Sequence, residues 1–269
     1  METLPYLISF FEQVDVLMLI LVRVLAFFIF VPVLSAMTIP MQVRLLLAFF
    51  LSTAIFSSGL VTQATFHDSV AGFFVLMLTE FMAGALMGFV LFFMFNIILF
   101  AGQFMDFSMG FAMVNVLDPI QQVQVPIIGN VLFMSVSVLF VINGGLNEVL
   151  FVFVRSYDIL PMGTAYIIGN VELASFIVGT LLAFVTLAIR IAIPLVGTML
   201  IIDICLGIMV KSVPQMNVFV VGMPLKILIG TFLMFSVIIP SLGWIYNLIF
   251  DPAFDALIDM IWGMAPYDG

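Results

Sequence analysis

The amino-acid sequence predicts an all-α integral membrane protein. Of its 269 residues, 65% are hydrophobic and only 8% are charged. The mean hydropathy of +1.39 lies far outside the range of water-soluble globular domains. Several apolar runs reach the roughly 20 residues that a helix needs to cross a hydrocarbon core. Because a segment in lipid must satisfy its own backbone hydrogen bonds, these runs are expected to be helices.

Six apolar runs are expected to form the helices. The third run is long for one crossing and is expected to tilt or to extend beyond the membrane. The fourth is interrupted by Asn143, Gly144 and Gly145, which predicts either two half-helices or an early helix end. In chain order, the runs cover residues 16–34, 45–60, 70–100, 127–154, 173–202 and 225–250.

The segment 203–226, between the fifth and sixth runs, is predicted to be a hairpin tip. Pro214 and Pro224 are expected at its turns, because proline disfavours continued helix. Its two lysines and Arg44 favour a cytoplasmic location for this tip, since positive charge gathers on that side. With six crossings, both termini would then lie outside.

The composition argues against several functions. Lysine and arginine number only 6 against 15 acidic residues, so nucleic acid is not an expected partner. Cys205 is the only cysteine and His67 the only histidine, which leaves no disulfide within the chain and no cysteine-based metal site. No phosphate-binding glycine loop or serine–base arrangement is visible. The sequence therefore predicts a protein that is not an enzyme and holds no cofactor or metal.

Three charged residues, Arg23, Glu80 and Arg190, lie inside apolar runs. A charge facing lipid there would cost ~2.5 kcal/mol or more, so each is expected to face protein. Glu80, Gly84 and Gly88 recur every four residues, which forms a helix face that a second helix can approach closely. These charges indicate either a proton or ion pathway, or charge-paired contacts within the chain or between subunits.

The segment 101–119 combines polar residues with large apolar ones. Gln103 and Asp106 would be costly in bare hydrocarbon, whereas the apolar residues are expected to pack. The segment could be an aqueous-side loop, a short, partly buried helix that joins two spans, or a plug in a pore. Composition alone favours the helix over the plug. The large apolar residues are Phe104, Met105, Phe107, Met109, Phe111 and Met113.

Over roughly residues 5–255, the chain resembles the FliR family of flagellar biosynthesis proteins, whose counterparts serve in virulence-type type III secretion. The most specific match is a Pro-Gln-x-Asn-x-Phe motif followed by Pro-x-Lys. The matching positions are Arg23, Pro32, Pro40, Arg44, Glu80, Gly84, Gly88, Gly102, Gln103, Asp106, Gly110, Asp118, Pro119, Pro194, Pro214, Gln215, Asn217, Phe219, Pro224 and Lys226.

The resemblance implies a core subunit of the flagellar export gate in the basal body of the bacterial inner membrane. With FliP and FliQ it would form a closed channel for unfolded flagellar proteins, served by export components such as FlhB and FlhA. Residues 1–172 would resemble FliP, and residues 173–269 would form a FliQ-like helical hairpin. Arg23, Glu80 and Arg190 would then bury against neighbouring subunits instead of lipid.

The resemblance also implies roles for two segments. Residues 101–119 would be the plug, with Phe104, Met105, Asp106, Phe107, Met109, Gly110, Phe111 and Met113 sealing the closed channel. The tip would face the cytoplasm through Lys211, Pro214, Gln215, Asn217, Phe219, Pro224 and Lys226.

Two other functions stay open at this point. A secondary transporter or ion channel would titrate Glu80, Asp106 and Asp203, and it would be active as an isolated chain. A membrane scaffold without a pore would show no electrical effect when the plug is changed.

Overall fold

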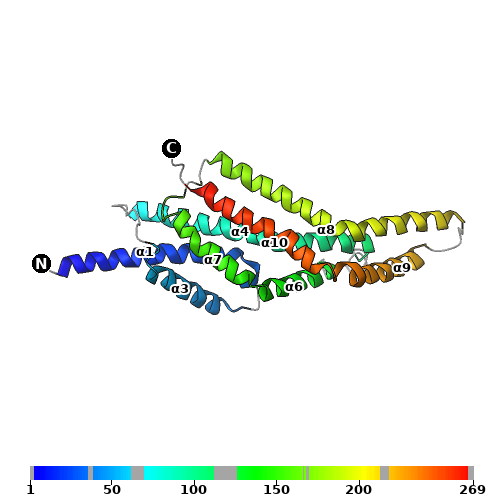
Figure 1. Ribbon diagram of the computed structural model, residues 1–269, viewed down its shortest axis with the longest axis horizontal. Helices are drawn as coiled ribbons and strands as arrows, with labels where there is room; N and C mark the ends of the chain where they lie inside the picture. Colours follow the sequence, from blue (N-terminus) through cyan, green and yellow to red (C-terminus); the bar gives the residue numbers. More distant parts are fainter. Residues whose placement is uncertain are drawn as a thin grey trace. The chain divides into compact units, whose positions relative to one another are not determined.

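The computed structural model describes residues 3–35, 39–61, 70–111, 126–165, 167, 170–212 and 218–265, and every element in these residues is a helix (Figure 1). The apolar runs fold this way because only a helix satisfies the backbone within a single segment. The elements are α1 (Thr3–Phe30), α2 (Pro32–Ser35), α3 (Met41–Ser57), α4 (Val70–Met109), α6 (Ile127–Ile142), α7 (Gly145–Ile159), α8 (Val171–Ser212), α9 (Val218–Leu233), the π-helix η1 (Met234–Ile238) and α10 (Leu242–Met264).

Four helices in the described residues are long and apolar enough to cross a membrane. They are Gln13–Phe30 within α1, the whole of α4, the whole of α8, and Val220–Ile238 in α9 and η1. Together α6 and α7 make a fifth candidate, although the pair is bent by 68°. The described part of the chain therefore supports fewer crossings than the six predicted, partly because α3 has only 17 residues.

Prolines and glycines break the helices at some predicted points and not at others. The predicted break in the fourth run is confirmed: Gly144 adopts a positive φ of 78° between α6 and α7, a conformation that glycine adopts without steric cost. The sixth apolar run, residues 225–250, is not a single helix in the structure, since it contains the end of α9, η1 and the start of α10. Pro240 has no N–H to donate, and the chain turns there between η1 and α10.

The chain divides into two compact units. The first contains residues 1–93, 144–180 and 252–269, and the second contains residues 94–143 and 181–251. Each unit therefore draws helices from distant parts of the chain. The predicted division at residue 172 rests on the resemblance to two partner proteins and stays a prediction.

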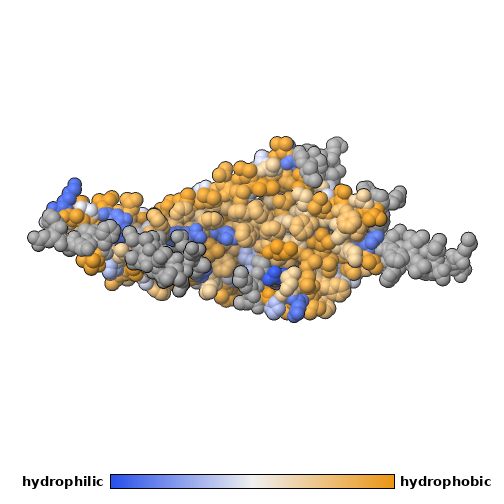
Figure 2. Space-filling model, turned by 180° about the vertical axis from the view of Figure 1, so that it is seen from behind, coloured by the Kyte–Doolittle hydropathy of each residue, from blue (hydrophilic) through white to orange (hydrophobic). Residues whose placement is uncertain are grey.

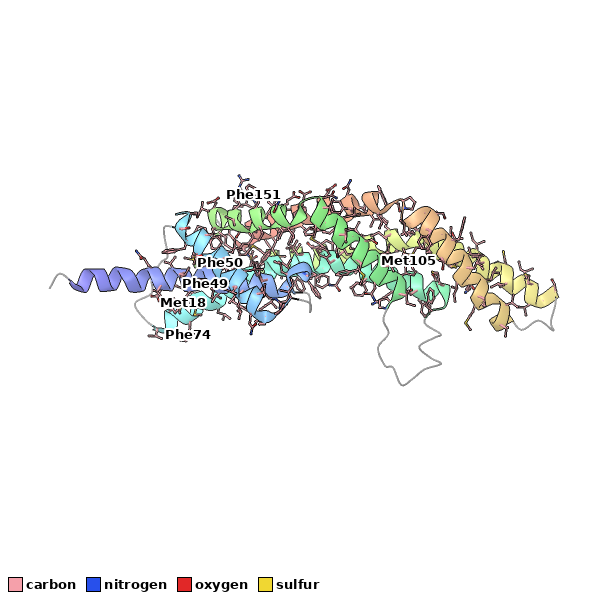
Figure 3. The ribbon with its side chains drawn as sticks, turned by 90° about the horizontal axis from the view of Figure 1, so that it is seen from below. Met18, Phe49, Phe50, Phe74, Met105 and Phe151 are labelled. Atoms are coloured by element: carbon pink, nitrogen blue, oxygen red, sulfur yellow. The ribbon has the colours of Figure 1, made fainter. Side chains whose placement is uncertain are left out.

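The first unit has a core between α1, α4 and α7. In this unit α1 also packs against α3 (Figure 1). The rings of Phe27 and Phe153 stack with their centroids 4.4 Å apart, and both side chains are almost fully buried. Met18, Phe50 and Phe74 are instead exposed (Figure 3), which leaves apolar surface outside the core.

The second unit has an aromatic core. Phe95 of α4 lies 5.1 Å from Phe140 of α6 and 5.4 Å from Phe250 of α10, measured between ring centroids. All three rings are completely buried. Much of α8 and α9 is exposed and apolar, and Figure 2 shows a face on which hydrophobic residues dominate. Such a surface needs lipid or other protein around it.

Candidate functional site

A buried ion pair joins α1 to α4 in the first unit. The Nε atom of Arg23 donates to an Oε2 atom of Glu80 at 2.5 Å, and both side chains are fully buried. The other two guanidinium nitrogens of Arg23 donate to the carbonyl of Leu160 at 3.2 and 3.3 Å. Oε1 of Glu80 accepts from the backbone N–H of Gly163 at 2.8 Å. Because the guanidinium and the carboxylate both have hydrogen-bond partners, the two charges can stay inside an apolar core.

The two glycines that follow Glu80 on α4 let α1 come close. A Cβ atom at Gly84 would overlap the carbonyl oxygen of Arg23, and one at Gly88 would lie 2.8 Å from the carbonyl oxygen of Phe27. Of the alternatives that the sequence left open, the structure shows a charge pair within the chain. The glycine face receives α1 of the same chain, so it is not available to a helix of another subunit.

Arg190 differs from Arg23. Its side chain is exposed on α8, and among the described residues it has no hydrogen-bond or ion-pair partner. The sequence predicted that all three charges inside apolar runs face protein. Among the described residues, that holds for Arg23 and Glu80 but not for Arg190.

The start of the predicted plug is the end of α4. Residues 101–109 continue this helix beyond Phe100, the predicted end, and the helix stops where Gly110 adopts a positive φ of 89°. The amide of Phe111 donates to the carbonyl of Asp106 at 3.0 Å, a common way to finish a helix. The remaining residues of the predicted plug, Met113 among them, lie outside the described part.

Asp106 caps a different helix. Its carboxylate accepts from the amide of Ile128 at 3.1 and 3.2 Å and from that of Gly129 at 3.4 Å. These amides belong to the first turn of α6, which has no capping side chain of its own and would leave its N–H groups unpaired. A Cβ atom at Gly102 would overlap the Cα atom of Gly129, so close backbone contact brings the carboxylate within reach.

The predicted plug residues separate into two groups. Met105 and Met109 are completely buried (Met105 is labelled in Figure 3), and Asp106 is 6% exposed. Phe104 and Phe107 are 48% and 76% exposed. The buried group therefore supports the fold, and only the exposed group is free to contact anything else. Gly110 and Phe111 are half-buried.

Met109 fits against a glycine of α9. Its side chain would overlap a Cβ atom at Gly230, with the Met109 Cγ and Sδ atoms both 2.8 Å from that position. We expect Gly230→Val to destabilise the protein by about 1–3 kcal/mol, because the extra carbons would displace a packed side chain. Thermal unfolding of the purified protein measures this loss.

A double substitution tests the cause of that loss. Met109→Ala should largely restore a chain that carries Gly230→Val, since it empties the space that the valine needs. Equal unfolding temperatures for the double and the Gly230→Val chains would show that the contact between α4 and α9 is not the reason.

The predicted hairpin tip is mostly helical. Lys211 lies exposed in the last turn of α8, and Lys226 of α9 forms an ion pair with Asp203 of α8. The prediction of a turn at Pro224 is wrong, since this residue lies inside α9. Between α8 and α9 lies the short stretch 213–217, which is outside the described residues. The predicted tip residues Pro214, Gln215 and Asn217 belong to this stretch. Phe219 belongs to α9, but its side chain is not described.

Sequence reasoning missed the groups that complete these contacts. The Leu160 carbonyl and the Gly163 and Ile128 amides are backbone groups, which leave no signature in a sequence. Gly129 and Gly230 are single glycines in apolar runs, and they resemble the open Gly197 and Gly207, whose Cβ positions meet nothing within 4 Å. In the described residues, no group of three or more His, Cys, Asp or Glu is placed to hold a metal ion.

The fold and these contacts define a polytopic helical membrane protein whose internal charges are used for structure and whose outer surface is apolar. The chain belongs to the bacterial export proteins, family 1, whose model matches residues 14–252. The predicted membership in the FliR family is confirmed by relatives that match most of the chain.

Three relatives illustrate this similarity. The flagellar biosynthetic protein FliR of Bacillus subtilis is 30% identical over 224 residues, covering 82% of this chain and 85% of the relative. FliR of Escherichia coli is 28% identical over 243 residues, 90% of each chain. The surface presentation of antigens protein SpaR of Shigella flexneri is 27% identical over 236 residues, 84% of this chain and 88% of the relative.

Proposed function

We propose that this chain is a core subunit of the flagellar type III export gate. The observation that carries this proposal is a family match over residues 14–252, with relatives named for flagellar biosynthesis. In this proposal the chain assembles with FliP and FliQ into a closed channel for unfolded flagellar proteins, in contact with components such as FlhB and FlhA. Its place is the basal body in the bacterial inner membrane.

The exposed surface supports a role within an assembly. Large apolar side chains lie exposed along α3, α8 and α9, and a chain surrounded by partner helices and lipid would cover them. We further propose that residues 1–172 take the place of a FliP-like subunit and that residues 173–269 take the place of a FliQ-like hairpin. The ion pair between Asp203 and Lys226 would hold that hairpin together near its cytoplasmic tip.

In the described part of the predicted plug, packed residues at the end of α4 form a base from which two aromatic side chains are exposed. Asp106 and Met109 hold the end of α4 against α6 and α9, and Met105 beside them is completely buried. Phe104 and Phe107 project from this base and are the described residues that could close a pore by dry contact. In this proposal they seal the closed channel against ions.

The transporter alternative has less support. It requires Glu80, Asp106 and Asp203 to gain and lose protons, yet each carboxylate has a fixed partner. Arg23 and a backbone amide hold Glu80, two backbone amides hold Asp106, and Lys226 pairs with Asp203. These are the contacts of structural carboxylates.

Assembly is tested by co-expressing the chain with FliP and FliQ and weighing the purified complex by native mass spectrometry. A discrete complex that contains this chain and both partners is expected. A chain that purifies alone, either monomeric or self-associated, would contradict the proposal and favour the transporter.

The plug role is tested by changing Phe104 and Phe107 together to alanine. Because both side chains are exposed, we expect the complex to assemble normally while the membrane becomes leaky to small ions. Single-channel conductance of the reconstituted complex measures the leak. Deleting residues 104–113 would be a poorer test, since Asp106 and Met109 hold neighbouring helices.

Phe100→Ala is the matched control. Phe100 lies one turn earlier on α4 and is 49% exposed, so its removal should leave the closed channel tight. If the double alanine chain assembles and conducts no more than the unchanged complex, Phe104 and Phe107 do not seal a pore, and a scaffold without a pore becomes the better interpretation.

A further inference from the structure

Arg190 is the only charged residue of α8 between Glu172 and Asp203. Asp203, the nearer of the two, is about 20 Å away along the helix axis at 1.5 Å per residue. Arginines near helix ends can extend to the membrane surface, but one in the interior of an apolar run needs a polar partner. Within the described residues, the chain supplies none.

Arg190 lies on the outward side of α8. Successive residues of a helix are turned by about 100°, which places Arg190 opposite the buried Ala188 and Met199. Gly197 and Ile201 follow on the same outward stripe, and both are exposed. This face is therefore the one farthest from the core of its own unit.

Two features of the backbone make the outward stripe receptive to another helix. A Cβ atom at Gly197 would meet nothing within 4 Å, so a helix can approach the backbone closely there. Pro194 lies inside α8 and has no N–H to donate to the carbonyl of Arg190 four residues earlier. Arg190 therefore offers two groups that a neighbouring helix could satisfy. Its guanidinium can donate hydrogen bonds, and its backbone carbonyl lacks the usual helical N–H donor.

The first unit shows how this protein accommodates an arginine among apolar helices. Arg23 is neutralised by Glu80 of a neighbouring helix, and the glycines Gly84 and Gly88 bring the two helices together. On α8, the arginine and Gly197 are present, but no helix in the described part of the chain brings a carboxylate to Arg190.

We infer that the outward stripe of α8 at Arg190 and Gly197 docks an apolar helix of a different subunit, which carries an aspartate or glutamate at the level of Arg190. Charge complementarity selects this occupant over an uncharged helix. It also disfavours a second copy of this chain on the same stripe, because two Arg190 side chains would then meet. The inference rests on the part of the proposed function that places the chain in an assembly.

The test compares Arg190→Leu with Arg155→Leu in the complex purified from cells through a tag on this chain. Arg155 is also exposed but lies on α7, so it controls for loss of a positive charge. Loss of Arg190 would leave the partner's carboxylate buried and unpaired. We therefore expect about tenfold or greater loss of co-purified partner subunits for Arg190→Leu, little loss for Arg155→Leu, and an intermediate result for Arg190→Lys.

A different result is expected if Arg190 faces lipid instead of a partner helix. If Arg190 faced lipid, leucine would improve the membrane surface of α8, and partner recovery would equal or exceed that of the unchanged chain. That result would overturn the inference. A wild-type chain that recovers no partner at all would instead contradict the proposed function, so the two failures are distinguishable.

A second measurement keeps Arg190 in place. A photoreactive benzoylphenylalanine in place of Ile201, which is exposed one turn from Gly197 on the same stripe, should form a covalent adduct with a different membrane protein of the apparatus. Peptide mapping of that adduct should locate an acidic residue in an apolar helix near the crosslink. An adduct with lipid alone, or with a second copy of this chain, would overturn the inference even if the leucine variant proved unstable.

Discussion

Glu80→Lys is expected to prevent stable packing of α1 against α4. It would place a second positive charge beside the buried guanidinium of Arg23 and remove the acceptor of the Gly163 amide. Removing one member of a buried ion pair costs about 3–5 kcal/mol, and a like charge in its place adds to that cost. Thermal unfolding and the amount of chain recovered in detergent measure the effect.

This result should appear in the chain itself, without any partner. Sequence reasoning placed Glu80 on a face that could have bound another subunit, but the structure places α1 of the same chain there. Glu80→Gln is the milder control, because it keeps an acceptor for Gly163 and introduces no positive charge. A Glu80→Lys chain that unfolds like wild type alone and fails only to bind partners would contradict the contact described here.

Gly102→Leu is expected to separate α4 from α6. A Cβ atom at this position would overlap the Cα atom of Gly129, and backbone cannot move aside as a side chain can. We expect a loss of about 3 kcal/mol or more in stability. The loss would include the cap that Asp106 provides to α6, since separation carries the Ile128 amide away from the carboxylate.

Gly207→Leu provides the matched control for this substitution. Gly207 is also a helical glycine of the second unit, but a Cβ atom there would meet nothing within 4 Å. Thermal unfolding of the two variants therefore separates steric overlap from the general effect of replacing a helical glycine. Similar melting temperatures for both would show that α4 and α6 do not need this close approach.

The helical character and several of its details could be predicted from sequence. Apolar length and composition predict α4 and α8, and the Asn143-Gly144-Gly145 sequence predicts the break between α6 and α7. The four-residue spacing after Glu80 predicts a face for close helix contact. Each of these signals is local, so neighbouring residues are enough to specify it.

The outcome at a single proline could not be predicted in the same way. Pro194 and Pro224 lie inside helices, whereas the helix ends at Pro240. All three remove one backbone donor, so local sequence does not distinguish them. Whether surrounding helices stabilise the continued helix is decided by tertiary packing.

The candidate site also depends on contacts between distant segments, which local sequence does not reveal. Asp106 and Gly102 make residues 101–109 look like an interruption in an apolar helix. In the structure, the carboxylate and the glycine serve a second helix that begins about 20 residues later in the chain. The polar residue is recognisable from sequence, but its partner is a backbone amide and is not.

The contacts of Arg23 and Glu80 cannot all form at the same time during protein synthesis. Arg23 and Glu80 are separated by 57 positions, but the Leu160 carbonyl follows Arg23 by 137 positions and the Gly163 amide follows Glu80 by 83. Because a chain leaves the ribosome from its N-terminus, the two charges emerge well before the backbone groups that complete their surroundings. Until the turn after α7 has been made, the atoms of Arg23 and Glu80 that later bind Leu160 and Gly163 need water or another temporary hydrogen-bond partner.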